Sequence, residues 1–170
     1  MSSKRYLTKS RLKEGLECPT KLFYSKNSEY QNNQKDDPFL ESLAEGGYQV
    51  EELAKFLISN QPYQDNITVE SLDYEESLKM TKLKLQNEIV SIAQPAFLFK
   101  NLFIRVDLLR KDKNSLTIYE VKSKSWGYEG VDDQEFRVFI KEYKRGLNKG
   151  KRVIDPNWKF YMYDIAFQRY

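Results

Sequence analysis

The sequence predicts an α/β domain in which a three-stranded or four-stranded mixed sheet is flanked by helices. Apolar residues keep helical spacing up to about residue 86, and three strand-like runs then follow between residues 89 and 124. Helical composition returns from residue 131. With 170 residues and 40% hydrophobic content, the chain can bury one core, so we expect a single globular domain over residues 1–170.

Three helices are expected before the strands. The first lies in LTKSRLKEGLECP, with Thr8 or Ser10 as its N-cap and Pro19 as its stop. The second lies in PFLESLAEGGYQVEELAKFLIS, where Gly46 and Gly47 interrupt the pattern at a bend or a close contact. The third, in VESLDYEESLKMTKLKLQNE, is an amphipathic covering helix. Its residues available for the core are Leu72, Met80 and Leu83.

The three strand-like runs are IVSIAQPAFLFKN, LFIRVDLLRKD and LTIYEVKSKS. Short turns at Lys100-Asn101 and at 111–115 separate them, and such connections are too short for a parallel crossover. An antiparallel meander is therefore expected. A helix over 132–147, a basic turn in NKGKRVIDPN and the aromatic run WKFYMYDIAFQRY complete the chain.

Composition excludes several kinds of chemistry. The chain has no histidine, which rules out a Ser-His-Asp triad, an HExxH zinc site and a histidine general base. Cys18 is its single cysteine, so neither an internal disulfide nor an iron–sulfur cluster can be formed within this chain alone. Catalysis would have to use carboxylates, lysines, tyrosines and metals.

The chain gives no sign of a membrane partner. No run approaches the roughly 20 apolar residues of a membrane span, and the N-terminal segment lacks the apolar region of a secretory signal. We therefore expect a cytoplasmic protein. The net charge of +3 neither requires nor excludes a polyanionic partner.

Two acidic residues and a lysine on neighbouring strands carry the chemical hypothesis. Asp107 lies within a mostly apolar run, and Glu120 and Lys122 share one face of the next strand because side chains alternate. If the strands form a hairpin, Asp107 lies near Glu120, and two close carboxylates repel unless a cation or a proton lies between them. Oxygen ligands favour Mg²⁺ or Mn²⁺. Lys122 could then stabilise charge on a phosphate or orient and deprotonate the attacking water.

This arrangement resembles the PD-(D/E)XK nuclease motif, with Asp107 followed by Glu120-Val121-Lys122, although Val106 stands where the eponymous proline would be. The segment SRLKEGLECPTKLFY is similar to the opening helix of the RecB-like branch, which includes CRISPR-adaptation nucleases and helicase-associated nuclease domains. The resemblance implies a restriction-endonuclease-like core and metal-dependent hydrolysis of DNA, exonucleolytic or end-directed. It also implies association with a helicase or another DNA-processing partner.

The same resemblance assigns roles to individual residues. Asp107 and Glu120 would bind Mg²⁺ or Mn²⁺ together with the Val121 carbonyl, and Lys122 would assist the attacking water. The segment GYQVEELA resembles the helix that supplies a further ligand, which would be Glu51, with Glu52 as the alternative.

The C-terminal segment YDIAFQRY is similar to the glutamine-containing motif of the branch, in which the glutamine approaches the active site and DNA. This residue is Gln168, one helical turn after Asp164. The tyrosine that follows in the family would fall at position 172, and the family core continues with another strand. The resemblance thus implies a domain truncated at its C-terminus.

Cys18 and the basic residues have alternative interpretations. The C-terminal cysteines of iron–sulfur family members are missing, so the resemblance leaves Cys18 as a relic or as the first ligand of a site completed in a longer protein. Within this chain, Cys18 is interpreted as a small buried apolar group. Basic residues after the third strand could contact DNA phosphates, or they could simply be a solvated helix face and turn. They are Lys124, Lys141, Lys144, Arg145, Lys149, Lys151 and Arg152.

Two other functions compete with hydrolysis. One is a non-catalytic nucleic-acid-binding or assembly module that retains the nuclease fold, although such a module would be expected to have lost at least one of Asp107, Glu120 and Lys122. The other is a small α+β domain without a nucleic-acid role, in which these residues form surface ion pairs across strands.

Overall fold

The computed structural model describes residues 5–25, 27, 29–30, 37–58, 66–123 and 140–169. It confirms the α/β class. The chain divides into two compact units, Met1–Ser123 and Lys124–Tyr170. Within the described ranges, every helix is too short or too polar to cross a membrane.

Two residues, Tyr6 and Leu7, anchor the N-terminal segment within the first unit. Tyr6 is buried against Tyr74 and Phe103, and Leu7 exchanges backbone hydrogen bonds with Asn101 (2.8 Å) and Phe103 (2.9 Å). Helix α1 (Lys9–Glu17) then begins, capped by the side chain of Thr8 as one of the two predicted caps. Helix α2 (Pro19–Tyr24) starts at the proline that was expected to stop α1.

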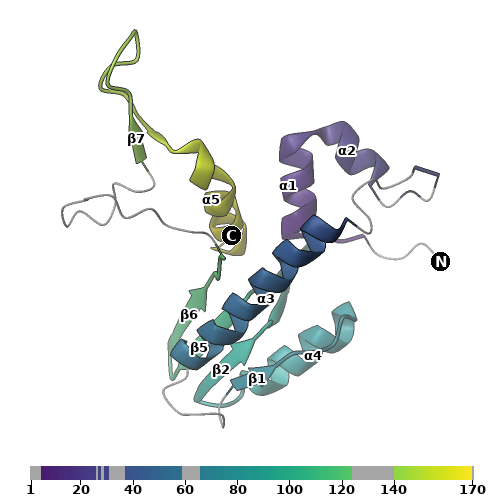
Figure 1. The fold of residues 1–170 in the computed structure, drawn as a ribbon. Coiled ribbons are helices and arrows are strands. Elements are labelled where there is room, and N and C mark those ends of the chain that lie inside the picture. Colours follow the sequence, from purple (N-terminus) through teal and green to yellow (C-terminus); the bar gives the residue numbers. More distant parts are fainter. Residues whose placement is uncertain are drawn as a thin grey trace. The chain divides into compact units, whose positions relative to one another are not determined.

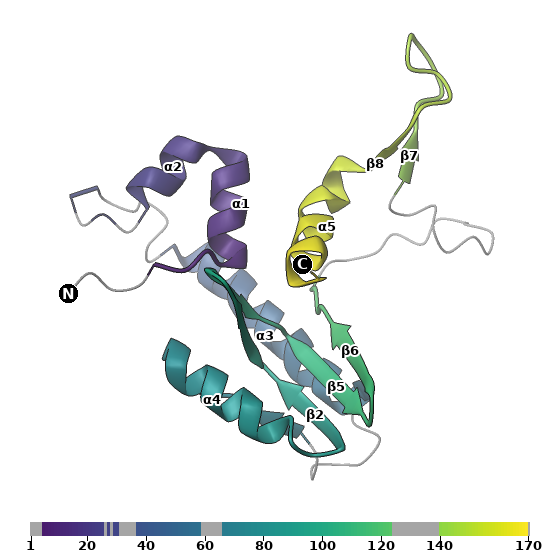
Figure 2. The same ribbon diagram turned by 180° about the vertical axis from the view of Figure 1, so that it is seen from behind.

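A four-stranded mixed sheet forms the centre of this unit, with the order β1 (Asn66–Thr68), β2 (Ile89–Ala93), β5 (Leu108–Asp112) and β6 (Ser115–Tyr119). Strand β1 runs parallel to β2. The other neighbouring strands, β2 with β5 and β5 with β6, are antiparallel (Figure 2). Strands β3 (Ala96–Phe99) and β4 (Leu102–Arg105) pair separately as a hairpin. The short strand β1 was not predicted.

A kink divides two of the predicted strands, so the prediction of three unbroken strands is wrong. The run from 89 becomes β2 and β3 around Gln94-Pro95, and the run from 102 becomes β4 and β5 around Val106-Asp107. Backbone hydrogen bonds still cross the kink, from Gln94 N to Asp107 O (2.9 Å) and from Val106 N to Pro95 O (3.0 Å). Gln94 has a φ of 56°, a left-handed conformation that is uncommon outside glycine.

Helix α4 (Tyr74–Lys84) covers one face of the sheet, as expected of a covering helix. Met80 packs on the buried cluster Val69, Val90, Ile92 and Leu109. Leu72 and Leu83 are exposed instead of contributing to the core, so that part of the prediction is wrong. The innermost side chains of α4 are the small polar Ser77 and Thr81, which let the helix approach the sheet closely.

Helix α3 (Pro38–Ile58) lies across the opposite face (Figure 1, Figure 2). It continues through Gly46 and Gly47 without the predicted interruption. Its sheet-facing stripe includes Gly47, Glu51 and Ile58, and the Ile58 carbonyl accepts a hydrogen bond from Arg110 of β5 (3.1 Å). The apolar residues that keep helical spacing in the sequence are exposed here: Phe39, Leu43, Val50, Leu53 and Leu57.

The second unit contains a hairpin and a helix. Strands β7 (Ile140–Glu142) and β8 (Arg152–Ile154) pair antiparallel, and α5 (Pro156–Arg169) follows. The expected helix over 132–147 is therefore wrong at 140–147, where β7 and the hairpin loop stand instead, and residues 132–139 lie outside the described ranges. The hairpin loop uses left-handed glycines at Gly146 (φ 78°) and Gly150 (φ 81°), where a side chain would be strained.

Candidate active site

The residues of the candidate site lie just beyond the ends of paired strands. Leu108 of β5 pairs with Tyr119 of β6, so Asp107 and Glu120 are the next residues outward from this pair. Asp107 lies at the kink between β4 and β5, not within a continuous strand as expected. The backbone N–H of Val121 donates to Asp107 Oδ2 (2.8 Å), which holds the two chain segments together beyond the strands.

Both carboxylates contact the same two ammonium groups. Lys122 Nζ is 3.8 Å from Asp107 Oδ2 and donates to Glu120 Oε1. Lys9 Nζ is 3.7 Å from Asp107 Oδ1, and it donates to Glu120 Oε1 (3.3 Å) and Oε2 (3.1 Å). The predicted convergence of Asp107, Glu120 and Lys122 is therefore present.

Lys9 is the residue that sequence reasoning missed. It is the first residue of α1 and lies 111 positions before Glu120. Its backbone is placed by the Thr8 cap, which accepts a hydrogen bond from the Arg11 amide, and by the Leu7–Leu102 bridge just before the cap. A lysine next to an N-cap carries no local signal of this contact, because the contact depends on how α1 docks against the strand ends.

Burial separates this cluster from ordinary surface ion pairs. The side chains of Asp107 and Glu120 are 17% and 7% exposed, whereas the Lys21–Glu17 pair on α1 and α2 is 50% and 36% exposed. Taking two carboxylates out of water is costly unless cations or hydrogen bonds compensate them. The low exposure of both carboxylates argues against the interpretation that these residues form ordinary surface ion pairs.

Glu51 lies next to the kink and not inside the cluster. It comes from the sheet-facing stripe of α3, one turn after Gly47, and it accepts a hydrogen bond from the Gln94 side chain. The Gln94 backbone is itself bonded to the Asp107 carbonyl. Glu52, the alternative to Glu51 as a further ligand, is 64% exposed and pairs with Lys55 of the same helix. Of the two glutamates, Glu51 therefore lies in the better position to act near the site.

The donor set fits a hard divalent cation with only part of its ligands from protein. Within the described ranges, no three acidic or cysteine side chains are grouped closely enough to hold a metal, so Glu51 is not gathered with the other two carboxylates. Mg²⁺ usually takes one or two protein carboxylates and completes its shell with water and phosphate oxygens. Asp107 and Glu120 meet that requirement, and lysine nitrogens nearby suit a phosphate substrate.

The predicted DNA-contacting residues belong to the second unit or lie outside the described ranges. Lys144 and Arg145 are exposed in the loop between β7 and β8, not on a helix as expected. Gln168 is half-buried on α5, one turn after Asp164. Lys124 lies outside the described residues.

Cys18 differs from its prediction. It is exposed between α1 and α2 and is not a buried apolar group. Hydrogen bonds from the backbone N–H groups of Lys21 and Thr20, at the start of α2, lower the pKa of its thiol.

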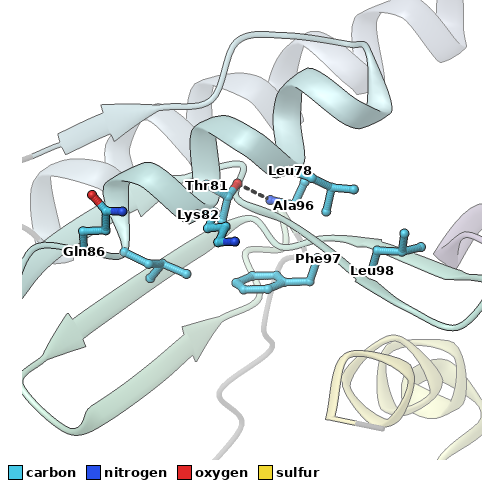
Figure 3. A pocket seen from close by; sticks show the side chains of 8 residues that line it. Leu78, Thr81, Lys82, Gln86, Ala96, Phe97 and Leu98 are labelled. Atoms are coloured by element: carbon cyan, nitrogen blue, oxygen red, sulfur yellow. Dashed lines mark hydrogen bonds between the residues drawn. The ribbon is translucent and has the colours of Figure 1, made fainter.

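A hollow of about 410 Å³ lies between α4 and β3, away from the carboxylates (Figure 3). Its lining is mainly apolar, with Lys82 and Gln86 as the long polar side chains. It contains neither a carboxylate nor a nucleophile activated by a base, so it offers no hydrolytic chemistry. The residues that line it are Leu78, Thr81, Lys82, Leu85, Gln86, Ala96, Phe97 and Leu98.

Comparison with known proteins found no matching protein-family model, no matching curated protein and no matching solved structure.

Proposed function

We propose that this chain is a metal-dependent nuclease with a restriction-endonuclease-like core, which hydrolyses phosphodiester bonds of DNA from an end. The observation that carries the proposal is the convergence of Asp107 and Glu120 on shared ammonium groups at adjoining strand ends. Two carboxylates in such an arrangement bind a cation readily because a cation placed between them relieves their mutual repulsion.

Each residue has a defined part in this proposal. Asp107 and Glu120 hold Mg²⁺ or Mn²⁺, which supplies Lewis-acid stabilisation of charge on the phosphate. Lys122, 31% exposed beside both carboxylates, orients the attacking water and stabilises the charge that develops on phosphate oxygens. Glu51 supports the site through Gln94, and the Val121 amide keeps Asp107 in place.

The rival function is a non-catalytic module that binds nucleic acid or assists assembly. One observation favours it: Asp107 and Glu120 are already neutralised by two lysines, a balanced set of two negative and two positive charges. Such a set can hold α1 against the strand ends without any cation.

DNA cleavage distinguishes the two functions. End-labelled single-stranded and duplex DNA would be incubated with the purified chain and Mg²⁺ or Mn²⁺. The test variants are Asp107→Ala and Lys122→Ala, and the matched control is Asp112→Ala, an exposed carboxylate at the far end of β5.

The nuclease proposal predicts cleavage by the unmodified chain and by the Asp112 variant, and none by the other two. Tight DNA binding without cleavage in any metal would support the rival. Equal cleavage by all four proteins would overturn the proposed roles of Asp107 and Lys122.

A further inference from the structure

Lys9 occupies a cation position between the two carboxylates of the candidate site. Its ammonium contacts both oxygens of Glu120 and Oδ1 of Asp107, while Lys122 contacts Oε1 of Glu120 and Oδ2 of Asp107. The two lysines thus engage different oxygens of Asp107, and Lys9 also contacts Glu120 Oε2 (3.1 Å).

The contacts of the three residues before Lys9 fix the position of its backbone. Thr8 caps α1 at this point, Leu7 bonds to the β3–β4 hairpin, and Tyr6 is buried in an aromatic cluster. The Lys9 side chain is itself only 20% exposed. The fold therefore delivers an ammonium group to the carboxylates from a separate element.

A divalent cation held by Asp107 and Glu120 would need oxygens that Lys9 now contacts. It would also repel the ammonium, because like charges at short range in a partly buried site interact strongly. Lys9 and the cation cannot both be bound there at full strength.

We propose that Lys9 is a positioning residue that acts as an internal counter-ion: it holds the Asp107–Glu120 pair together and yields its place when a divalent cation binds. This inference rests on the proposed function, in which Asp107 and Glu120 bind a divalent cation. It adds that Lys9 competes with this cation for the two carboxylates. Binding of the cation is then coupled to movement of the Lys9 side chain away from Asp107 and Glu120.

The test compares Lys9→Met with Lys9→Arg, which keeps the charge, and with Lys21→Met, which removes the lysine of the exposed pair between Glu17 of α1 and Lys21 of α2. Thermal melting in EDTA measures how much Lys9 stabilises the fold as a counter-ion. Calorimetric titration with MnCl₂ measures the competition between Lys9 and the cation. Circular dichroism establishes that each variant is folded.

We expect Lys9→Met to melt at a lower temperature than the parent in EDTA and to bind Mn²⁺ at least about fivefold more tightly, since a competing ion pair is removed. The other two variants should stay within about twofold of the parent Kd. A folded Lys9→Met protein with unchanged or weaker Mn²⁺ binding would overturn the inference.

A second measurement uses the unmodified chain, in case Lys9→Met does not fold. Acetylation of lysines by an activated ester, read by mass spectrometry, should increase at Lys9 when Mn²⁺ is added and stay constant at Lys21. Unchanged labelling of Lys9 at saturating Mn²⁺ would overturn the competition. Neither measurement requires DNA cleavage. If the chain binds Mn²⁺ as described but cleaves no DNA, the proposed nuclease function is wrong and the inference about Lys9 still holds.

Discussion

The backbone N–H of Val121 donates a 2.8 Å hydrogen bond to Oδ2 of Asp107, which ties the residue that precedes β5 to the segment that follows β6. This contact fixes one carboxylate oxygen and leaves Oδ1 directed to Lys9. The Asp107 side chain is thereby held at the kink, outside any strand.

The first prediction separates the charge of Asp107 from its hydrogen bond. Asp107→Asn keeps an oxygen acceptor for the Val121 amide, whereas Asp107→Ala leaves that amide without it and should lose about 1–3 kcal/mol of unfolding free energy. Urea denaturation measures the difference. Both variants should have only background nuclease activity, and equal stability of the two would show that the hydrogen bond contributes nothing.

A second prediction concerns Arg105, which clamps the kink from β4. Its guanidinium donates to the carbonyls of Gln94 (3.3 Å), Val69 (3.1 Å) and Ser71, and burial lowers its pKa. Arg105→Ala should destabilise the fold by about 2–3 kcal/mol because charge-assisted bonds to partly buried carbonyls are lost. Lys79→Ala, on the exposed side of α4, is the control in the same urea titration. Comparable losses of unfolding free energy in both variants would show that the Arg105 hydrogen bonds do not stabilise the kink.

Thr81 provides a third prediction, on the packing of α4. Its hydroxyl donates to the Ser77 carbonyl (2.8 Å) and accepts from the Ala96 amide (2.9 Å), the bond drawn in Figure 3. Thr81→Val keeps the shape but leaves a buried N–H unsatisfied, at a cost of about 1–3 kcal/mol. Thr81→Ser keeps the hydroxyl and should cost less. The opposite order in thermal melts would mean that the methyl group matters more than the bond.

The fourth prediction is a stabilising substitution at Gly47. A Cβ there would lie 3.8 Å from Ser123 Oγ, an ordinary contact, and the helix is continuous at this point. Gly47→Ala should therefore raise the unfolding free energy by about 0.5–1 kcal/mol through lower backbone entropy of the unfolded chain. A lower melting temperature would show that α3 and Ser123 approach more closely than this contact allows.

The fifth prediction is the pH dependence of Cys18 alkylation. Because backbone N–H groups of Lys21 and Thr20 lower the thiol pKa in the folded chain, the thiolate forms at lower pH there than in the unfolded chain. The rate of alkylation by iodoacetamide should rise with pH, and the midpoint of this rise should lie at a lower pH in the folded protein than in the same protein in urea. Coincident midpoints in both states would contradict it.

Features with local causes could be predicted from the sequence. Thr8 caps α1 through a bond to the Arg11 amide (3.4 Å), and the turn at Lys100-Asn101 joins β3 to β4. Both depend on residues within a few positions of each other. The pairing of the Asp107 and Glu120 segments also followed from a short hairpin connection.

Features with distant causes could not be predicted in this way. The kink at Gln94 is hidden in a continuous apolar run, where only Pro95 gives a local sign that the strand is interrupted. Lys9 meets Glu120 only because Tyr6 and Leu7 dock α1 beside the strand ends. The exposed apolar stripe of α3 shows the same limit, since periodicity identifies a face but not what lies against it.

The most direct test of the account is a calorimetric titration of MnCl₂ into the unmodified chain, Asp107→Asn, Glu120→Gln and the double variant. Two carboxylates that share one cation should each be required, so either single substitution should weaken binding nearly as much as both together. Losses that simply add, or binding that survives in the double variant, would show that Asp107 and Glu120 do not form one site.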